Sequence, residues 1–280
     1  MPLLQKGYLG STPLFRNIPF FAGPQVTASN SNTATITVTA SASTNTKGAW
    51  AQAIASTTTE TTLLAFFVSG IATSAQNSAT LIDIGVGAAG SETVVIPNIA
   101  VGSATALNIM VPVKIASGSR ISIRSQSAVA SKSFTIATRN FAAFNAGDSA
   151  LTPTTLDVLG TSTATSTGTA MSGASATWVE IVASTSQNYS AFSIVPSVSD
   201  TDIAAIEPLV YEIGVGSAGS EISFGRIILS TANTESVSMR PVGPLIFGRE
   251  VPSGSRLSIR HNITANPGKY DACIIAVPKV

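Results

Sequence analysis

Short runs in which polar and apolar residues alternate recur along this chain. The alternation is clear in Thr33–Thr39 and in the related runs Ser119–Arg124 and Ser255–Arg260. A period of two residues is that of a β-strand with one buried face. Clusters of Gly, Pro, Asn and Ser separate such runs roughly every 8–12 residues, and no stretch keeps the period of an amphipathic helix. The pattern therefore predicts an all-β protein.

Three segments of the chain occur twice, in the same order. They are Trp50–Ser56 and Trp178–Ser184, Ile84–Glu92 and Ile213–Glu221, and Ser117–Arg124 and Ser253–Arg260. The second copies follow the first by 128, 129 and 136 residues, so the chain is a duplication with loop insertions. Each copy offers about eight strand-like runs, which suits a jelly roll better than a seven-stranded immunoglobulin sandwich. We expect two tandem jelly-roll-like β-sandwiches, at residues 26–146 and 147–280, preceded by an extended N-terminal arm.

The arm, residues 1–25, stands outside the repeat and is rich in apolar side chains. Its four prolines disfavour a helix and favour an extended path. One interpretation is a strand and loop laid on the first sandwich. The other is an arm that docks on a neighbouring subunit, and this is the one we predict. The assembly contacts would be Leu3, Leu4, Tyr8, Leu14, Phe15, Ile18, Phe20 and Phe21.

Charged residues make up only 10% of the chain, and the formal net charge is +1. Such a chain has no strong field with which to attract nucleic acid or an acidic membrane surface. Met1–Gly7 lacks the basic and apolar regions of a signal peptide, and the longest strongly apolar run, Leu63–Val68, is far shorter than a membrane helix. A weakly charged surface favours association. We therefore expect no nucleic acid and no membrane as partners, but further copies of the chain.

Two segments match the GxGxxG pattern of dinucleotide-binding proteins. They are Gly85–Gly90 and Gly214–Gly219. That pattern holds a pyrophosphate only where a strand turns into a helix. Here Glu92–Pro97 and Glu221–Phe224 follow, and both are strand-like. We expect a strand, a glycine-rich turn and a returning strand, with glycines that allow positive φ or close backbone approach. No cofactor is expected.

The chain has one histidine, His261, and one cysteine, Cys273. One of each cannot form a usual zinc site or an internal disulfide, so no metal is expected. Cys273 lies in the apolar run Ala272–Val277 and is expected to be a buried small hydrophobe. A lone histidine at a strand end is expected to be solvated or hydrogen-bonded rather than the base of a catalytic triad.

Charged residues also recur at matched positions of the two copies. The matched pairs are Asp83 and Glu212, Glu92 and Glu221, Arg120 and Arg256, and Arg124 and Arg260. Equivalent places in two domains usually lie far apart, so these carboxylates are poor candidates for the paired acids of a glycosidase. We expect them in turn hydrogen bonds or ion pairs with arginine. Three arrangements are open for the four arginines. They could contact a neighbour's carboxylates, lie on solvated strand faces, or pair within the domain with Glu92 and Glu221. No catalytic residues are expected.

Three of these features together resemble virion structural proteins of tailed bacteriophages. They are the segment Ile84–Glu92, the tryptophan-containing strand before it and the Ser-Gly-Ser-Arg-Ile strand after it. The resemblance covers most of residues 47–124 and again 176–260. It implies a protein of the virion without catalytic activity.

The leading hypothesis is an accessory virion protein that decorates or cements the capsid surface. Its arm would grip neighbouring copies or other virion proteins. The alternative is a tail, neck or fibre component that binds host cell-surface glycans through its sandwich loops. Both hypotheses place the chain in the virion.

Overall fold

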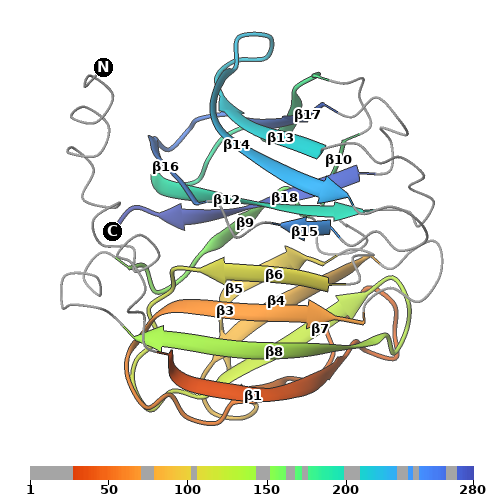
Figure 1. Ribbon diagram of the computed structural model, residues 1–280, viewed down its shortest axis with the longest axis vertical. Coiled ribbons are helices and arrows are strands. Elements are labelled where there is room, and N and C mark those ends of the chain that lie inside the picture. The colour runs from red at the N-terminus through yellow and green to blue at the C-terminus, as the bar shows by residue number, and fades with distance from the viewer. Residues whose placement is uncertain are drawn as a thin grey trace.

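The computed structural model describes residues 28–70, 79–101, 106–142, 152–161, 168–171, 176–198, 209–231, 239–241, 246–262 and 270–280 (Figure 1). These residues form strands, turns and loops, with no helix among them. The strands lie in four sheets, and every described strand pair is antiparallel. The prediction of an all-β protein is therefore confirmed.

The first sandwich consists of two four-stranded sheets. Sheet A has the order β1 (Ala28–Thr39), β8 (Ser133–Ala142), β3 (Thr61–Ser69) and β6 (Ala106–Val111). Sheet B has the order β2 (Ala51–Ile54), β7 (Ile121–Ser127), β4 (Thr80–Val86) and β5 (Thr93–Ala100). The chain passes back and forth between the sheets, and this arrangement is that of a jelly roll.

The second sandwich repeats these orders with small additions. Sheet C has the order β10 (Thr169–Ala170), β18 (Tyr270–Pro278), β12 (Tyr189–Val198) and β16 (Ile246–Val251), and β9 (Asp157–Leu159) also pairs with β18. Sheet D has the order β11 (Val179–Val182), β17 (Leu257–His261), β13 (Leu209–Val215), β14 (Ile222–Thr231) and β15 (Met239–Pro241). Sheet C therefore corresponds to sheet A, and sheet D to sheet B. The prediction of two similar sandwiches is confirmed.

The expected boundary between the sandwiches, at residues 146 and 147, falls outside the described residues and stays a prediction. The same holds for the N-terminal arm, because the first described residue is Ala28.

The alternating runs bury one face of β1 and β8, as the pattern predicts, but in β7 and β17 the polar Ser122 and Ser258 on the other face are buried as well. Along β8, for example, Phe134, Ile136 and Thr138 are buried, while the residues between them are at most half-buried. Side chains such as Val38, Leu64, Ile84 and Ile123 fill the space between sheets A and B. Removing apolar side chains from water is the main favourable contribution to such a core.

Sheet C departs from the alternating rule, because both of its faces are buried. On β18, Ala272, Ile274 and Ala276 belong to the core of the second sandwich. Cys273, Ile275 and Val277, on the opposite face, belong to the cluster that also contains the core of the first sandwich. Figure 1 shows sheet C lying across the end of the first sandwich, where its strands β9, β12 and β18 contact β5, while β15 of sheet D lies beside β6.

This packing explains the continuous apolar sequence of β18 and confirms that Cys273 is a buried small hydrophobe. Its side chain is 0% exposed. Burial raises the pKa of the Cys273 thiol to about 12, which keeps it protonated at neutral pH.

We expect the two sandwiches to unfold together, because they share one hydrophobic cluster. Variants Trp178→Phe and Trp50→Phe each leave one fluorescent reporter, in the first and second sandwich respectively. In each single-tryptophan background, Ile275→Ala should lower the free energy of unfolding by about 2–5 kcal/mol. The urea midpoint reported by Trp50 and the one reported by Trp178 should fall by the same amount. The control Val129→Ala, at a position 43% exposed, should change stability by less than about 0.5 kcal/mol. Separate midpoints for the two reporters would contradict a shared core.

Candidate functional site

The two glycine-rich segments are turns of antiparallel hairpins. Gly85 and Val86 end β4, the turn follows, and β5 returns from Thr93. In the second sandwich β13 and β14 flank the equivalent turn. The turn closes with a hydrogen bond from the Ser91 amide to the Ala88 carbonyl, 3.0 Å long, where a nucleotide-binding protein would begin a helix. The predicted strand-connecting turns are confirmed, and the nucleotide-binding interpretation fails on local structure.

Two of the three glycines in each turn are required by backbone conformation. Gly87 and its equivalent Gly216 have φ of 137° and 135°. A Cβ on either would also lie within 2.9 Å of a backbone oxygen across the turn. Gly90 and Gly219, with φ of 82° and 79°, take the left-handed conformation that glycine adopts without strain.

The remaining glycine makes room for a tryptophan ring. A Cβ added to Gly85 would lie 2.6 Å from the six-membered ring of Trp50, and one added to Gly214 would lie 2.6 Å from that of Trp178. Trp50 directly precedes β2, so its ring crosses sheet B to reach β4. The close approach of backbone and ring explains why Trp and Gly recur together in both copies.

An arginine then covers each tryptophan. The Arg124 guanidinium lies 4.5 Å from the centre of the Trp50 ring, and Arg260 lies 4.5 Å from that of Trp178. Such cation–π contacts contribute on the order of 0.5–1 kcal/mol when partly exposed. The Nε atoms of the two arginines donate hydrogen bonds of 2.9 and 2.8 Å to Asp83 and Glu212. Tryptophan, arginine and carboxylate thus form one repeated stack on the outer face of sheets B and D.

Each of these two carboxylates has a second cation, which comes from a different place in each copy. Lys47, in the loop before β2, donates a 2.8 Å hydrogen bond to Asp83. Glu212 instead pairs with Arg226, on β14. Burial alone would raise the pKa of Glu212, but its two arginine partners hold that pKa below its ordinary value. For Lys47, burial lowers the pKa despite the nearby Asp83.

A second pair of ions fastens each turn to the neighbouring strand. Arg120 bonds to Glu92 and, at 3.0 Å, to Gln52. Its equivalent Arg256 bonds to Glu221, at 2.6 Å. The predicted pairing within the domain with Glu92 and Glu221 is therefore confirmed for these two arginines.

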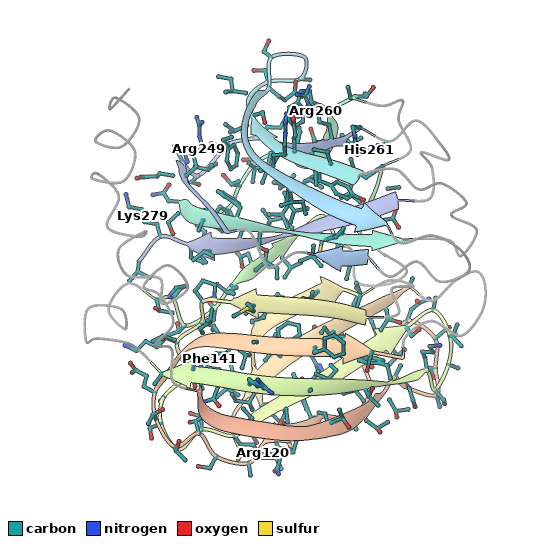
Figure 2. All side chains as sticks on the ribbon, viewed as in Figure 1. Arg120, Phe141, Arg249, Arg260, His261 and Lys279 are labelled. Carbon is teal, nitrogen blue, oxygen red and sulfur yellow. The ribbon has the colours of Figure 1, made fainter. Side chains whose placement is uncertain are left out.

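These carboxylates are held ionised. The hydrogen bond from Arg256 lowers the pKa of Glu221, and Arg120 does the same for Glu92 against the opposing effect of burial. A carboxylate kept ionised by a fixed arginine is unsuited to act as a general acid near neutral pH. The two sets lie in different sandwiches, so they do not combine into one site. Figure 2 shows Arg120 and Arg260 toward opposite ends of the molecule.

His261 lies inside the second sandwich and is hydrogen-bonded rather than solvated. Its side chain is 4% exposed. The Nε2 atom lies 3.0 Å from the Met171 carbonyl oxygen, and the ring makes an edge contact with Tyr211. The Tyr211 hydroxyl reaches the Asp271 carbonyl oxygen at 3.3 Å. Its counterpart in the first sandwich, Ser125, is also buried.

The buried carboxyl of Asp271 is a feature that the sequence analysis missed. It is 3% exposed, and burial raises its pKa to about 6. Asp271 lies at the start of the apolar run of β18, and no motif or repeat distinguishes it there.

Among the described residues, no three His, Cys, Asp or Glu side chains gather as a metal site would require. No described helix is long and apolar enough to span a membrane. The eight predicted assembly contacts of the arm, Leu3 to Phe21, lie outside the described residues, so their role stays a prediction.

Comparison with known proteins gives fold resemblance only. No family model and no curated protein sequence matches the chain. Among solved structures, the STIV MCP, a major capsid protein of an archaeal virus, is 11% identical with a TM-score of 0.34. The match covers 87% of this chain and 95% of that one.

A second solved structure is the tandem CBM22-1–CBM22-2 domain of Xyn10C from Paenibacillus barcinonensis. It is 9% identical with a TM-score of 0.25, over 91% of this chain and 99% of that one. Both matches span nearly the whole duplicated chain, but at these scores neither bears on function. The resemblance to tailed bacteriophage proteins stays a prediction.

Gly85→Ala should destabilise the protein through its contact with Trp50. The new methyl group would overlap the ring, and such overpacking costs about 1–3 kcal/mol. In a Trp50→Ala background the same change should cost little, because the ring is gone. A double-mutant cycle on the free energy of unfolding measures the difference. Gly214→Ala with Trp178→Ala forms the equivalent cycle in the second sandwich. If Gly85→Ala lowers the free energy of unfolding equally with and without the Trp50 ring, the close contact between them is refuted.

Asp271→Asn should stabilise the protein at neutral pH but not in acid. Because the native pKa, about 6, exceeds the unfolded value of 3.8, the native state binds the proton more tightly. The contribution of this group to stability is present below about pH 4 and is lost as the pH rises through about 6. At about pH 7.5 the variant should gain up to about 3 kcal/mol over the wild type.

Urea unfolding at several pH values measures this gain, which should shrink to near zero by about pH 4. Glu92→Gln is the control, and its effect on stability should have the opposite sign. The pKa of Glu92 is lowered, so that variant should lose stability at neutral pH and recover it in acid. A gain from Asp271→Asn that is independent of pH would contradict the assignment.

Proposed function

We propose that this chain is a non-catalytic structural protein of a virus particle, and that it decorates or cements the capsid surface. The observation that carries the proposal is the structural role of the residues that recur in both copies of the repeat. Glycines, tryptophans, arginines and carboxylates that recur in both copies all serve to fasten a hairpin turn onto its sheet. The residues that recur in both copies therefore make the contacts that hold each hairpin turn against its sheet and stiffen the sandwich.

The composition supports the same role. With 15 basic and 14 acidic residues in 280, the chain has few charges, and many of those described are used in ion pairs within a sheet. The remaining surface depends largely on the hydroxyl groups of Ser and Thr for its contact with water. A surface of low charge does little to keep like molecules apart. A weakly charged surface suits a subunit that is packed against other subunits in an assembly.

The arm supports attachment to neighbouring subunits. Its eight apolar residues are too many for a free tail, since disordered segments are poor in such residues. Fully burying a Leu or Phe is worth about 1.5–3 kcal/mol, while ordering the backbone costs about 1–2 kcal/mol per residue. The arm therefore needs a well-fitting apolar groove.

The proposal is tested directly by locating the chain in purified particles. Mass spectrometry of gradient-purified virions should find it at a fixed ratio to the main shell protein, and a density map should place it on the shell. Density on a tail or fibre would support the alternative, and binding of cell-surface glycans by the isolated chain would do the same. Absence of the chain from purified particles would overturn the virion role.

Deleting residues 1–25 should leave both sandwiches folded but abolish incorporation into particles. Circular dichroism and the urea midpoint report folding, and the ratio of this chain to shell protein reports incorporation. The control variant Gln5→Ala, Lys6→Ala, Asn17→Ala changes polar positions of the arm only and should incorporate normally. If the truncated chain enters particles at unchanged occupancy, the arm is not the anchor.

A further inference from the structure

One edge of sheet A is formed by β1, which pairs with β8 and with no other described strand. Figure 1 shows β1 as the outermost strand of sheet A, at the end of the molecule away from the second sandwich. It is 12 residues long, from Ala28 to Thr39, and contains neither a charged residue nor a proline. Short length, charges and prolines are common means of keeping a sheet edge from pairing with another chain. β1 uses none of these three.

The strands at the corresponding edges of the other three sheets are short. In sheets B and D the edge strands β2 and β11 have four residues each, and a register shift interrupts the pairing of both. In sheet C the place of β1 is taken by β9 and β10, with three and two residues. Short and bulged edge strands resist further pairing. The long edge of β1 is therefore the exception among these four.

The hydrogen bonds at the end of β1 fix the pattern of its pairing with β8. The Ala40 amide donates a 2.8 Å hydrogen bond to the Lys132 carbonyl, so these two residues form a hydrogen-bonded pair. In antiparallel strands such pairs alternate with non-hydrogen-bonded pairs, whose side chains are closer. The next pair, Thr39 and Ser133, is accordingly not bonded through its backbone, and its two hydroxyl oxygens lie 2.8 Å apart.

The same alternation continues without a register shift back to Thr35. Ile36 and Val38 therefore hydrogen-bond to β8 through their backbones, whereas Thr35 and Thr37 direct their amides and carbonyls away from β8. Among the described residues these outward groups face no paired strand, since β1 is the last strand of its sheet. They can accept and donate hydrogen bonds to a strand from outside the molecule.

The side chains define where this open stretch is centred. Thr35 and Thr37 are exposed on the outer face, and Ile36, on the inner face, is only half-buried although it packs against the core. At Thr39 the loop before β2 approaches the edge, because a Cβ on Gly48 would lie 2.4 Å from the Thr39 carbonyl oxygen. The open stretch therefore centres on Ile36, an apolar side chain at the rim of the core that a further strand would cover.

We propose that β1 pairs antiparallel with β1 of a second copy of this chain, with the two Ile36 residues opposite each other. In this register Thr35 of each copy forms a hydrogen-bonded pair with Thr37 of the other. The two Ile36 side chains then meet on the inner face as a non-hydrogen-bonded pair and cover each other. The A sheets of both copies become one continuous sheet. The contact is isologous, so it closes as a dimer.

The absence of charge on β1 is the reason for choosing a second copy as the partner. A two-fold axis brings each residue of the strand close to its equivalents, so any charge would meet a like charge, which is destabilising. β1 has no charge, and threonines opposite each other on neighbouring strands are a favourable pair. The formal net charge of +1 also gives two copies little mutual repulsion. A charged partner would find no opposite charge on this strand.

This inference goes beyond the proposed function and does not depend on it, because the pairing is measured on the purified full-length chain. Sedimentation equilibrium should show a dimer whose proportion rises with concentration. Thr37→Pro should weaken the dimer by about tenfold or more, because it removes two symmetry-related hydrogen bonds. It removes no bond to β8, and an edge strand tolerates a proline whose nitrogen points outward. Circular dichroism and the urea midpoint should therefore stay close to those of the wild type.

Phe67→Glu is the matched control, because it changes the outer face of sheet A and leaves its edge intact. Phe67 lies on β3 and is 45% exposed. This variant should dimerise as the wild type does. Loss of the dimer in Phe67→Glu but not in Thr37→Pro would mean that copies meet through the face of the sheet, and would overturn the proposal.

A disulfide test reads the register directly and does not need the proline variant. In a Cys273→Ala background, Thr35→Cys and Thr37→Cys chains are mixed in a glutathione redox buffer. Opposite residues have Cα atoms about 5.5 Å apart, which suits a disulfide, whereas diagonal residues are about 7–8 Å apart. The mixed disulfide dimer should therefore exceed either disulfide homodimer by about fivefold or more. Val129→Cys, on the turn between β7 and β8, replaces Thr37→Cys as the control and should not cross-link.

Two further results would overturn the proposal. One is a chain that stays monomeric up to the highest soluble concentration. The other is a mixture of Thr35→Cys and Thr37→Cys chains in which the mixed disulfide does not exceed the two homodimers, because the strands would then not pair about Ile36. Neither result would contradict incorporation into particles, which is measured separately.

Discussion

A sheet that is apolar on both faces must have both faces covered, and sheet C imposes this constraint on the whole molecule. Its inner face is covered by sheet D, and its outer face needs a second partner. The open side of the first sandwich supplies that partner, since β5 presents apolar residues such as Val95 and Ala100 to the strands of sheet C. Each buried apolar Å² is worth roughly 25 cal/mol, so the two sandwiches are joined by the same force that holds each together.

The few charges of the chain act locally within this framework. The only apolar side chains within each hairpin turn are those of alanine, and its glycines would leave it loose. The tryptophan against Gly85 or Gly214 and the ion pair to Glu92 or Glu221 fix the turn to its sheet. Asp83 and Glu212 draw their second cation from different elements. What the two copies share is thus the physical arrangement, even where the residue that supplies it differs.

Much of this fold could be predicted from sequence, because alternation and repetition are local signals. Runs such as Ser133–Thr138 alternate because one face is buried. The three repeated segments predicted the two sandwiches and their equivalence. The glycine-rich turns could be assigned because the residues after them were strand-like. The docking of sheet C could not be predicted. A continuous apolar run such as Ala272–Val277 shows that both faces are buried but not what covers them.

The candidate site was less predictable for a related reason. Ion pairs of Glu92 and Asp83 with arginine were among the expected arrangements, but Asp83 also pairs with Lys47, which is 36 residues away in the sequence. Such a contact depends on strand order, which the sequence does not reveal. Asp271 carries no sequence signal at all, because its raised pKa comes from its own burial, which depends on how the sheets pack.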